Sequence, residues 1–452
     1  MMSAKGYLNT GKRKFKRVKY REFYEGHGKN GLFGKGMNCD LVSGGIYPAM
    51  ETELFVLNGK TSAVYGATDG IMKIARAERN GFIEKNFAYL TGGGYLHSFN
   101  FVEDGFNGVG HRFVKTPEIF NVFEKDGDEI VVFASRDGVV LYDFIGGVET
   151  VLWTASSAAF CFHDRIFAGY QSDLYFSAHQ DYRNFTESTD EGGKISLPSE
   201  KGYIVGGCVV GENCYLIFQR GIMKLTATGA ARDFVIEEVP YDGAEIVPAS
   251  AKPVGQYLFF LTREGPVRFD GKRSEKICEE MDIRADVSEF TCDCAVFEGR
   301  VYVSYRDENK QKKMFVADVG KGKGFFLSPD VWTGLSVSDG MLLCACNERF
   351  AKVVRGGTQK TSVKRRFEVK DFDFETVGEK LLKKVSLKGG GKVYVTFYGK
   401  RGSKDGTVFA LDLTDGEDGF YPLLKGDRFS FTIELGEGGF VTELEAEIAV
   451  FS

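Results

Sequence analysis

The sequence predicts an all-β protein built around a β-propeller of six to eight blades, with an N-terminal extended arm and a C-terminal β-sandwich-like domain. Five β-hairpin signals begin near Arg165, Cys214, Tyr257, Val301 and Met341, at spacings of 49, 43, 44 and 40 residues. Strand repeats of this period are typical of β-propellers. The content of 40 Phe, 20 Tyr and 57 Gly among 452 residues favours half-buried strands joined by many tight turns.

Each hairpin signal pairs two short apolar runs across a polar turn. In the second signal, residues 214–218 and 222–225 flank Gln219-Arg220-Gly221, which is a typical turn between two strands. Earlier hairpins are predicted with less regular spacing, so the number of blades stays between six and eight. These earlier hairpins pair residues 61–65 with 71–75, 87–90 with 95–99, and 130–134 with 139–144.

Changes in composition divide the chain into three parts. Residues 1–52 are expected to form a basic arm and a glycine-rich connector, and residues 53–357 the propeller. Polar and apolar residues alternate with period 2 within residues 358–452, notably over 429–435 and 444–450. This last part is expected to be an antiparallel β-sandwich, with a long last blade that closes the ring as the alternative.

The basic arm is the candidate interaction site. Between Lys5 and Arg21 there are eight basic residues and no acidic one. Three interpretations stay open: a solvated arm, a strand that docks on an acidic protein partner, and a segment that neutralises nucleic-acid phosphates. The residues expected to contact a partner or DNA are Lys12, Arg13, Lys14, Lys16, Arg17 and Lys19.

The sequence contains no recognisable motif for catalysis or cofactor binding. The five histidines form no zinc-binding pattern, and the glycine-rich stretches neither follow a strand nor open a helix as a phosphate loop requires. The pairs Cys292/Cys294 and Cys344/Cys346 are expected to be small core residues, with a zinc site as the alternative. We therefore expect no catalytic residue, no cofactor, no metal and no enzymatic activity.

Features that determine location point to a cytoplasmic protein. Nine cysteines are spread thinly through the chain, which predicts reduced thiols rather than a disulfide framework. We expect neither a signal peptide nor a membrane span, because no long apolar run occurs. The formal net charge of −5 disfavours nucleic-acid binding by the chain as a whole.

Several short motifs resemble those of β-propeller virion proteins from tailed bacteriophages and prophages. These proteins share an "R-x-F" strand, an "L-Y-x-S" element, a "D-x-x-N-F" turn and a strand ending in "G-I-x-x-L". The corresponding residues here are Arg165-Ile-Phe167, Leu174-Tyr-Phe-Ser177, Asp181 to Phe185, and Gly221-Ile-Met-Lys-Leu225. Tyr47-Pro48-Ala49-Met50 is similar to their "Y-P-x-L" element, although Glu51-Thr52-Glu53 stands where the family usually has an arginine.

The resemblance implies a non-enzymatic virion structural protein, similar in architecture to the tail nozzle and head-tail stabilisation proteins of short-tailed phages. It implies assembly as a homo-oligomeric ring in the tail or head-tail connector region, in contact with portal, adaptor or tail proteins and near DNA. The expected location is the virion, assembled in the cytoplasm of the host bacterium. The alternative function is a propeller that binds or processes glycans of the host surface.

Overall fold

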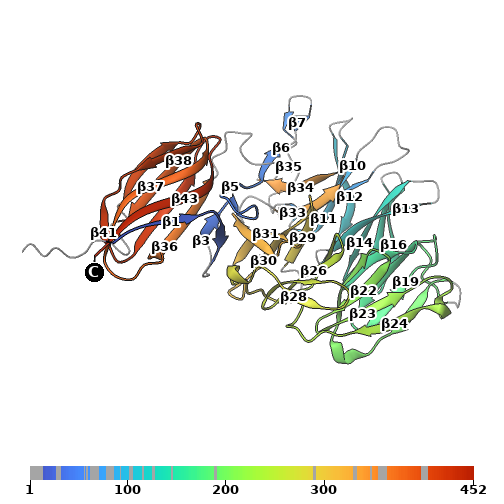
Figure 1. The fold of residues 1–452 in the computed structure, drawn as a ribbon. Helices are drawn as coiled ribbons and strands as arrows, with labels where there is room; N and C mark the ends of the chain where they lie inside the picture. The colour runs from blue at the N-terminus through green and yellow to red at the C-terminus, as the bar shows by residue number, and fades with distance from the viewer. Residues whose placement is uncertain are drawn as a thin grey trace, which may run out of the picture. The chain divides into compact units, whose positions relative to one another are not determined.

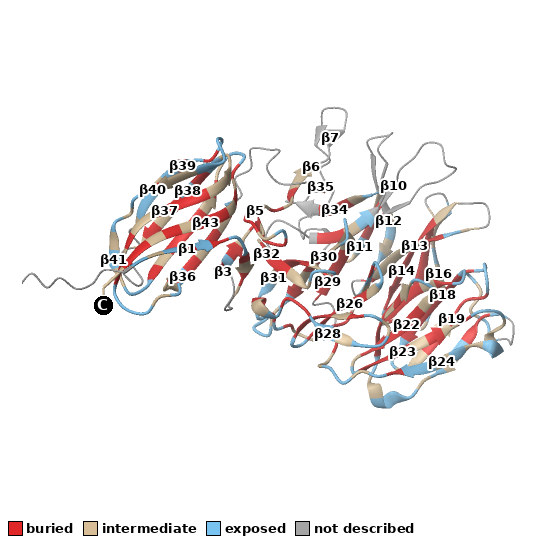
Figure 2. Cartoon of the chain, in the orientation of Figure 1, coloured by how far each residue is buried: buried red, intermediate tan, exposed pale blue. Residues whose placement is uncertain are grey.

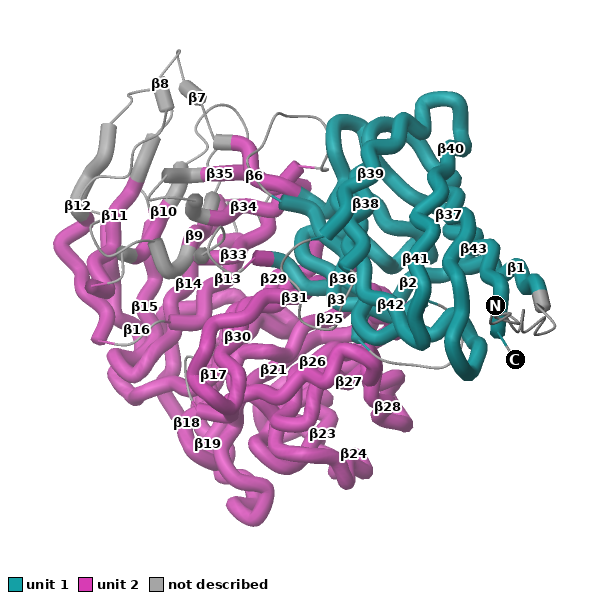
Figure 3. The backbone as a smooth tube through the Cα atoms, turned by 90° about the vertical axis from the view of Figure 1, so that its left-hand side faces the viewer, with its two compact units in different colours: residues 1–50, 324–327, 355–452 teal, residues 51–323, 328–354 magenta. Residues whose placement is uncertain are grey.

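The protein consists of two compact units (Figure 3): unit 1 comprises Met1–Met50, Gly324–Leu327 and Arg355–Ser452, and unit 2 comprises Glu51–Lys323 and Ser328–Val354. The computed structural model describes residues 14–26, 32–54, 56–57, 60–61, 71–77, 86–91, 93–100, 105–114, 117–124, 128–143, 146–187, 191–288, 292–328, 333–338, 340–346, 349–354, 364–398 and 406–451. Helical structure within these ranges is limited to three 3-10 turns, η1 (Ser199–Lys201), η2 (Ala231–Asp233) and η3 (Glu279–Met281). None of the described helical elements is long and apolar enough to cross a membrane.

Seven four-stranded sheets lie within the described ranges (Figure 1), and six of them are formed by consecutive strands. The first three are β9 (Ile71–Ala77), β10 (Asn86–Thr91), β11 (Tyr95–Asn100) and β12 (Gly105–Arg112); β13 (Glu118–Phe123), β14 (Glu129–Ser135), β15 (Gly138–Asp143) and β16 (Gly147–Leu152); and β17 (Ala158–Phe162), β18 (Arg165–Tyr170), β19 (Asp173–Phe176) and β20 (Gly193–Ser196). The next three are β21 (Ile204–Val210), β22 (Asn213–Phe218), β23 (Gly221–Thr226) and β24 (Val235–Val239); β25 (Lys252–Val254), β26 (Tyr257–Thr262), β27 (Gly265–Phe269) and β28 (Ser274–Lys276); and β29 (Cys292–Phe297), β30 (Arg300–Arg306), β31 (Lys312–Asp318) and β32 (Lys323–Leu327). This succession of four-stranded sheets is the architecture of a β-propeller.

The seventh sheet combines strands from distant parts of the sequence. It contains β33 (Thr333–Ser338), β34 (Met341–Cys346) and β35 (Arg349–Val354), and its fourth strand is β6 (Glu51–Leu54). β6 pairs antiparallel with β35, with Glu51 opposite Val354. The sheet that begins near residue 333 is therefore completed by a strand from the start of unit 2.

The five hairpin signals that define the sequence period are confirmed as the second strands of their sheets, β18, β22, β26, β30 and β34. The earlier hairpins at 87–99 and 130–144 are confirmed as β10–β11 and β14–β15. For the hairpin expected to pair 61–65 with 71–75, residues 62–70 lie outside the described residues. At the β26–β27 turn, Gly265 has a φ of +124°, which only glycine adopts without strain. The turn residues therefore set the period that the sequence displays.

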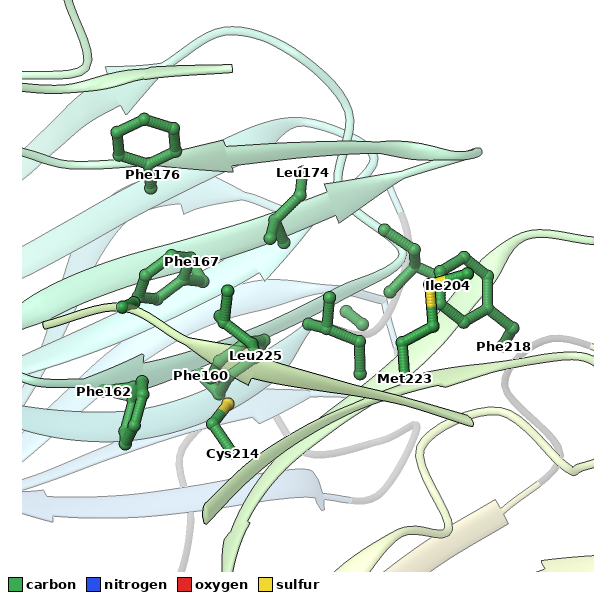
Figure 4. Close-up of a cluster of buried hydrophobic side chains, with 13 residues drawn as sticks. Phe160, Phe162, Phe167, Leu174, Phe176, Ile204, Cys214, Phe218, Met223 and Leu225 are labelled. Carbon is green, nitrogen blue, oxygen red and sulfur yellow. The ribbon is translucent and has the colours of Figure 1, made fainter. Parts of the chain in front are cut away.

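Apolar side chains from neighbouring sheets interlock to form the core of unit 2. The first strands of consecutive sheets lie next to each other, and β33 lies next to β9. Between the third and fourth sheets, Phe160 and Phe167 pack with Leu216, Phe218 and other apolar residues of β22 and β23 (Figure 4). Similar clusters lie between the first and second, the second and third, and the fourth and fifth sheets. The sheets are thus joined by packing as well as by the chain.

Unit 1 consists mainly of two larger sheets. The first contains β1 (Lys14–Tyr20), β43 (Phe440–Val450), β37 (Lys380–Gly390) and β40 (Glu417–Phe420) in that order, and β41 (Leu424–Gly426) also pairs with β37. The second contains β2 (Phe23–Glu25), β3 (Leu32–Met37), β36 (Arg366–Phe372), β42 (Phe429–Leu435), β38 (Lys392–Tyr398) and β39 (Gly406–Asp412). Two short pairs complete the described strands, β4 (Cys39–Asp40) with β5 (Tyr47–Pro48), and β7 (Val56–Leu57) with β8 (Lys60–Thr61).

The two sheets of unit 1 pack face to face as a β-sandwich. Buried and exposed residues alternate along its strands (Figure 2), as in Val393, Val395 and Phe397 of β38, which are all buried. Aromatic rings meet across the sandwich: the ring centroids of Phe397 and Phe420 lie 5.9 Å apart. Period-2 alternation of polar and apolar residues buries one face of each sheet, which explains why the β-sandwich was predictable from the sequence.

The expected N-terminal extended arm requires a correction. From Lys14 on, the segment is not an arm but strand β1, which pairs with β43 through seven residues, from Lys14↔Val450 to Tyr20↔Leu444. Alternation predicts that a segment is a strand but not which distant strand it joins. The prediction treated residues 1–52 and residues 358–452 as separate parts of the protein, whereas strands from both ranges share one sheet.

Candidate interaction site

Strand β1 carries the basic residues singled out by the sequence. Its side chains alternate, so Val18 and Tyr20 are buried in the sandwich, whereas Phe15, Arg17 and Lys19 face solvent. This alternation follows from the pleat of a strand, in which successive side chains point to opposite faces. Arg17 and Lys19 therefore lie in one row along the outer face of the sheet, whereas Lys16 has the same parity as Val18 and Tyr20.

A row of glutamates on β43 faces these cations. Arg17 forms ion pairs with Glu445 at 3.1 Å and with Glu447 at 2.5 Å. Lys19 pairs with Glu443 at 2.9 Å and with Glu445 at 3.2 Å. Because both rows follow the period of 2, the antiparallel register places Arg17 opposite Glu447 and Lys19 opposite Glu445.

Glu443 is the centre of this ladder. Its side chain is only 9% exposed. Its carboxylate forms ion pairs with Lys19, with Arg21 at 2.7 Å, and with Lys388 of β37 at 3.3 Å. Burial alone would raise the pKa of Glu443, but hydrogen bonds from these three cations outweigh it and lower the pKa to about 2. The carboxylate is therefore charged at neutral pH and ties three strands together.

The remaining arm residues differ in how far the structure describes them. Lys16 donates a hydrogen bond of 2.9 Å to the backbone carbonyl of Glu375. Lys14 is described by its backbone, which pairs with Val450, and Lys12 and Arg13 lie outside the described residues. Contact of these six residues with a partner or DNA stays a prediction, and the described cations of the row already pair with carboxylates of the same chain.

Sequence reasoning missed the glutamates as partners of the basic row. The signal was present, because Glu443, Glu445 and Glu447 have the same spacing of two residues as Arg17, Lys19 and Arg21. Matching charge rows on two predicted strands indicates antiparallel pairing in one sheet. Residues some 430 positions apart in the sequence could have been joined on that basis.

A second cluster surrounds Arg165 and contains residues of the short motifs singled out in the sequence, Arg165 and Ser177 among them. Arg165, at the start of β18, is only 2% exposed, and its guanidinium donates hydrogen bonds to the carbonyls of Ser177 (2.8 Å), Glu191 (3.0 Å) and Gly229 (3.4 Å). The guanidinium also lies over the ring of Phe234, 5.6 Å from its centroid. Burial lowers the pKa of Arg165, but a guanidinium stays protonated. Arg165 thus ties the third sheet to the loop between β23 and β24.

The neighbouring motif residues extend this cluster toward the second sheet. The hydroxyl of Ser177 accepts a hydrogen bond from the amide of Ile166 at 2.9 Å. Tyr182 donates its hydroxyl proton to the carbonyl of Phe123 at 3.1 Å, and Arg183 pairs with Glu149 at 2.9 Å. Arg165, together with Tyr182 and Arg183 of the turn at residues 181–185, therefore ties the second, third and fourth sheets together.

The cysteine pairs occupy core positions. Cys292 and Cys294 are buried on β29 with their sulfur atoms 3.4 Å apart, and Cys344 is buried on β34. The side chain of Cys346 lies outside the described residues. Over the described ranges, no three His, Cys, Asp or Glu side chains are placed to hold a metal ion. Burial of the three described cysteines agrees with their interpretation as small core residues.

A polar cavity of about 400 Å³ lies on the fifth sheet, where Tyr257, Arg268, Asp270 and Glu275 contribute to its lining. Arg268 donates to Glu275 at 2.8 and 2.9 Å and to the carbonyls of Val319 and Gly320. Asp270 accepts two backbone amides of its own turn. The charged groups of this cavity therefore already stabilise the fold.

Comparisons with known proteins leave the family open. No protein-family model and no curated protein matches the chain. Solved structures with limited likeness include the computationally designed protein Ika8 (14% identity, 68% of this chain and 100% of that chain, TM-score 0.39) and a virginiamycin B lyase from Staphylococcus aureus (10%, 68% and 99%, TM-score 0.43). BamB from Moraxella catarrhalis has 12% identity over 67% of this chain and 88% of that chain, with a TM-score of 0.38. These scores carry no argument about fold or function.

Proposed function

We propose that the chain is a non-enzymatic structural protein of a tailed-bacteriophage or prophage particle, with the propeller as a scaffold in the tail or head-tail connector region. The attribution to a phage particle rests on the sequence resemblance. One observation supports a structural role: Arg165 of the "R-x-F" element donates a hydrogen bond to the carbonyl of Gly229 beside the fourth sheet, and Tyr182, within the "D-x-x-N-F" turn, donates one to the carbonyl of Phe123 of the second sheet. Residues used in this way serve rigidity rather than chemistry.

We further infer that the seven sheets are seven blades of a closed ring. The contact between β33 and β9 and the use of β6 as the outer strand of the last blade support this inference. A ring closed by a strand from its own beginning resists opening, since separation of the first and last blades would break the pairing of β6 with β35. A rigid ring with loops at both faces suits a scaffold that binds neighbouring proteins.

The proposed partners are further copies of the chain, arranged in a ring, together with portal, adaptor or tail proteins near DNA. The proposed location is the virion. Cyclic symmetry is common among homo-oligomers, and a ring of three or more subunits uses head-to-tail contacts. The pairing of Arg17 and Lys19 with β43 favours the interpretation of the basic segment as a docked strand over a phosphate-binding arm, with its own chain as the acidic partner.

Imaging of the purified protein and of particles tests this proposal. Negative-stain electron microscopy should show discrete rings of the full chain, and an antibody against the chain should label the tail or connector region of intact particles. A monomer that binds defined glycans on an array, with particles that carry no copy of the chain, would overturn the proposal and favour the glycan-binding alternative.

A further inference from the structure

Strand β39 forms one edge of the six-stranded sheet in unit 1. In the described residues it pairs on one side only, with β38, from Lys392↔Asp412 to Tyr398↔Gly406. Three residues of its outer face are exposed: Val408 is 59% exposed, and Ala410 and Asp412 are also exposed. Within the described residues, β39 therefore has no second neighbouring strand.

Two hydrogen bonds fix the direction of the backbone groups of β39. The amide of Leu413 donates to the carbonyl of Gly391, toward β38, at 2.8 Å. The amide of Asp412 donates instead to the carboxylate of Asp418, away from β38, at 3.3 Å. Since successive residues of a strand alternate in direction, the amides and carbonyls of Val408 and Ala410 also point away from β38.

The composition of this edge favours pairing with another strand. Residues 406–411, Gly-Thr-Val-Phe-Ala-Leu, contain neither a charge nor a proline. Natural edge strands commonly carry charges that block such pairing, and β1, an edge of the other sheet, does so with Lys14, Lys16, Arg17 and Lys19. One edge of the sandwich is thus protected, and β39 is not.

We propose that β39 pairs antiparallel with β39 of a second copy of this chain across a two-fold axis at Phe409. In this register, Val408 of each copy lies opposite Ala410 of the other, and their outward amides and carbonyls form the hydrogen bonds between the copies. Gly406 lies opposite Asp412, so the two Asp412 carboxylates stay at opposite ends of the joint, roughly 20 Å apart. Uncharged side chains meet at its centre, and the sheet continues from one copy into the next.

The strand is self-complementary, which favours a second copy over an unrelated segment. A two-fold contact uses the same surface on both partners, so each favourable pair occurs twice. Phe409, which stacks on Phe420 with ring centroids 4.1 Å apart, would meet Phe409 of the other copy on the inner face. This contact is separate from the proposed head-to-tail ring, and either can exist without the other.

Charge substitutions on the full chain test the register. We expect the wild-type mass, measured by light scattering and sedimentation equilibrium, to double as concentration rises. Ala410→Lys and Val408→Glu should each raise the dissociation constant of this contact about threefold or more, because two like charges then lie diagonally across the joint on its outer face. The double variant Val408→Glu/Ala410→Lys places Glu opposite Lys twice and should restore most of the affinity.

Val377→Lys is the matched control, because Val377 is 94% exposed in unit 1 and lies outside β39. It should leave the dissociation constant unchanged, and circular dichroism should show that all variants are folded. A mass that does not change with concentration would overturn the proposal. So would single variants that associate like the wild type, or a double variant as weak as the single ones.

Discussion

Substitution of Arg165 should destabilise the propeller unit strongly although the residue touches no ligand. Arg165→Ala removes three hydrogen bonds and leaves the buried carbonyl of Ser177 without its donor. The fully buried bond counts for about 2 kcal/mol and the two partly buried bonds for about 1 kcal/mol together, and the cavity left by the side chain adds about 1 kcal/mol. Relief of the buried charge offsets part of this sum, so we expect a loss of about 3 kcal/mol in the free energy of unfolding.

Urea denaturation, followed by circular dichroism and tryptophan fluorescence, measures this loss. Arg165→Lys should cost less than Arg165→Ala, because an ammonium keeps the charge but cannot reach three carbonyls in the geometry of the guanidinium. Arg183→Ala is the control: its side chain is 40% exposed in its ion pairs with Glu124 and Glu149, so a loss of less than about 1 kcal/mol is expected. Equal losses for Arg165→Ala and Arg183→Ala would refute the assignment of Arg165 as a tie between sheets.

Three further predictions concern pH, packing and ring closure. Because the pKa of Glu443 is lowered to about 2, the stability that its carboxylate contributes is present above about pH 4.5 and is lost as the pH falls toward 2. Urea denaturation at a series of pH values should show that the free energy of unfolding of the wild type falls by up to about 2 kcal/mol in this window. For Glu443→Gln the fall should be smaller. Gly207→Ala should lower the thermal midpoint and cost about 1–3 kcal/mol of the free energy of unfolding, because a Cβ there would lie 2.0 Å from the ring of Phe160. Gly206→Ala is the control: its Cβ would meet only ordinary contacts, so this variant should behave like the wild type. Replacement of Glu51–Leu54 by a Gly/Ser segment should raise proteolysis between the first and last sheets, and an unchanged cleavage rate would contradict closure by β6.

Local signals made the strands of the propeller predictable. The hairpins at β18, β22 and β26 combine apolar runs with turn residues, and both features depend on a few neighbouring residues. No comparable local sequence signal predicts which distant strands pair with each other. No strand was predicted over Glu51–Leu54, because the place of β6 beside β35 depends on contacts between distant parts of unit 2.

The candidate site shows the same division. Period-2 alternation made β43 predictable as a strand, and the run of cations made β1 a candidate site. Their mutual pairing was not predicted, because each segment was interpreted by itself. For the motif around Arg165 the sequence indicated a structural role. It did not indicate the three carbonyls that accept hydrogen bonds from the guanidinium: those of Ser177 and Glu191, between β19 and β20, and that of Gly229, between β23 and β24.

The pairing of β1 with β43 has a consequence for biosynthesis. The two strands are about 430 residues apart in the sequence, as in the hydrogen bond from Arg17 to Glu447. At a translation rate of ~5–20 residues per second, β1 waits roughly 20–90 s on the ribosome before its partner exists. During this time Lys14, Lys16, Arg17 and Lys19 keep an unpaired strand soluble and repel identical strands on neighbouring ribosomes. The charges that later join the sandwich thus first protect the nascent chain from aggregation.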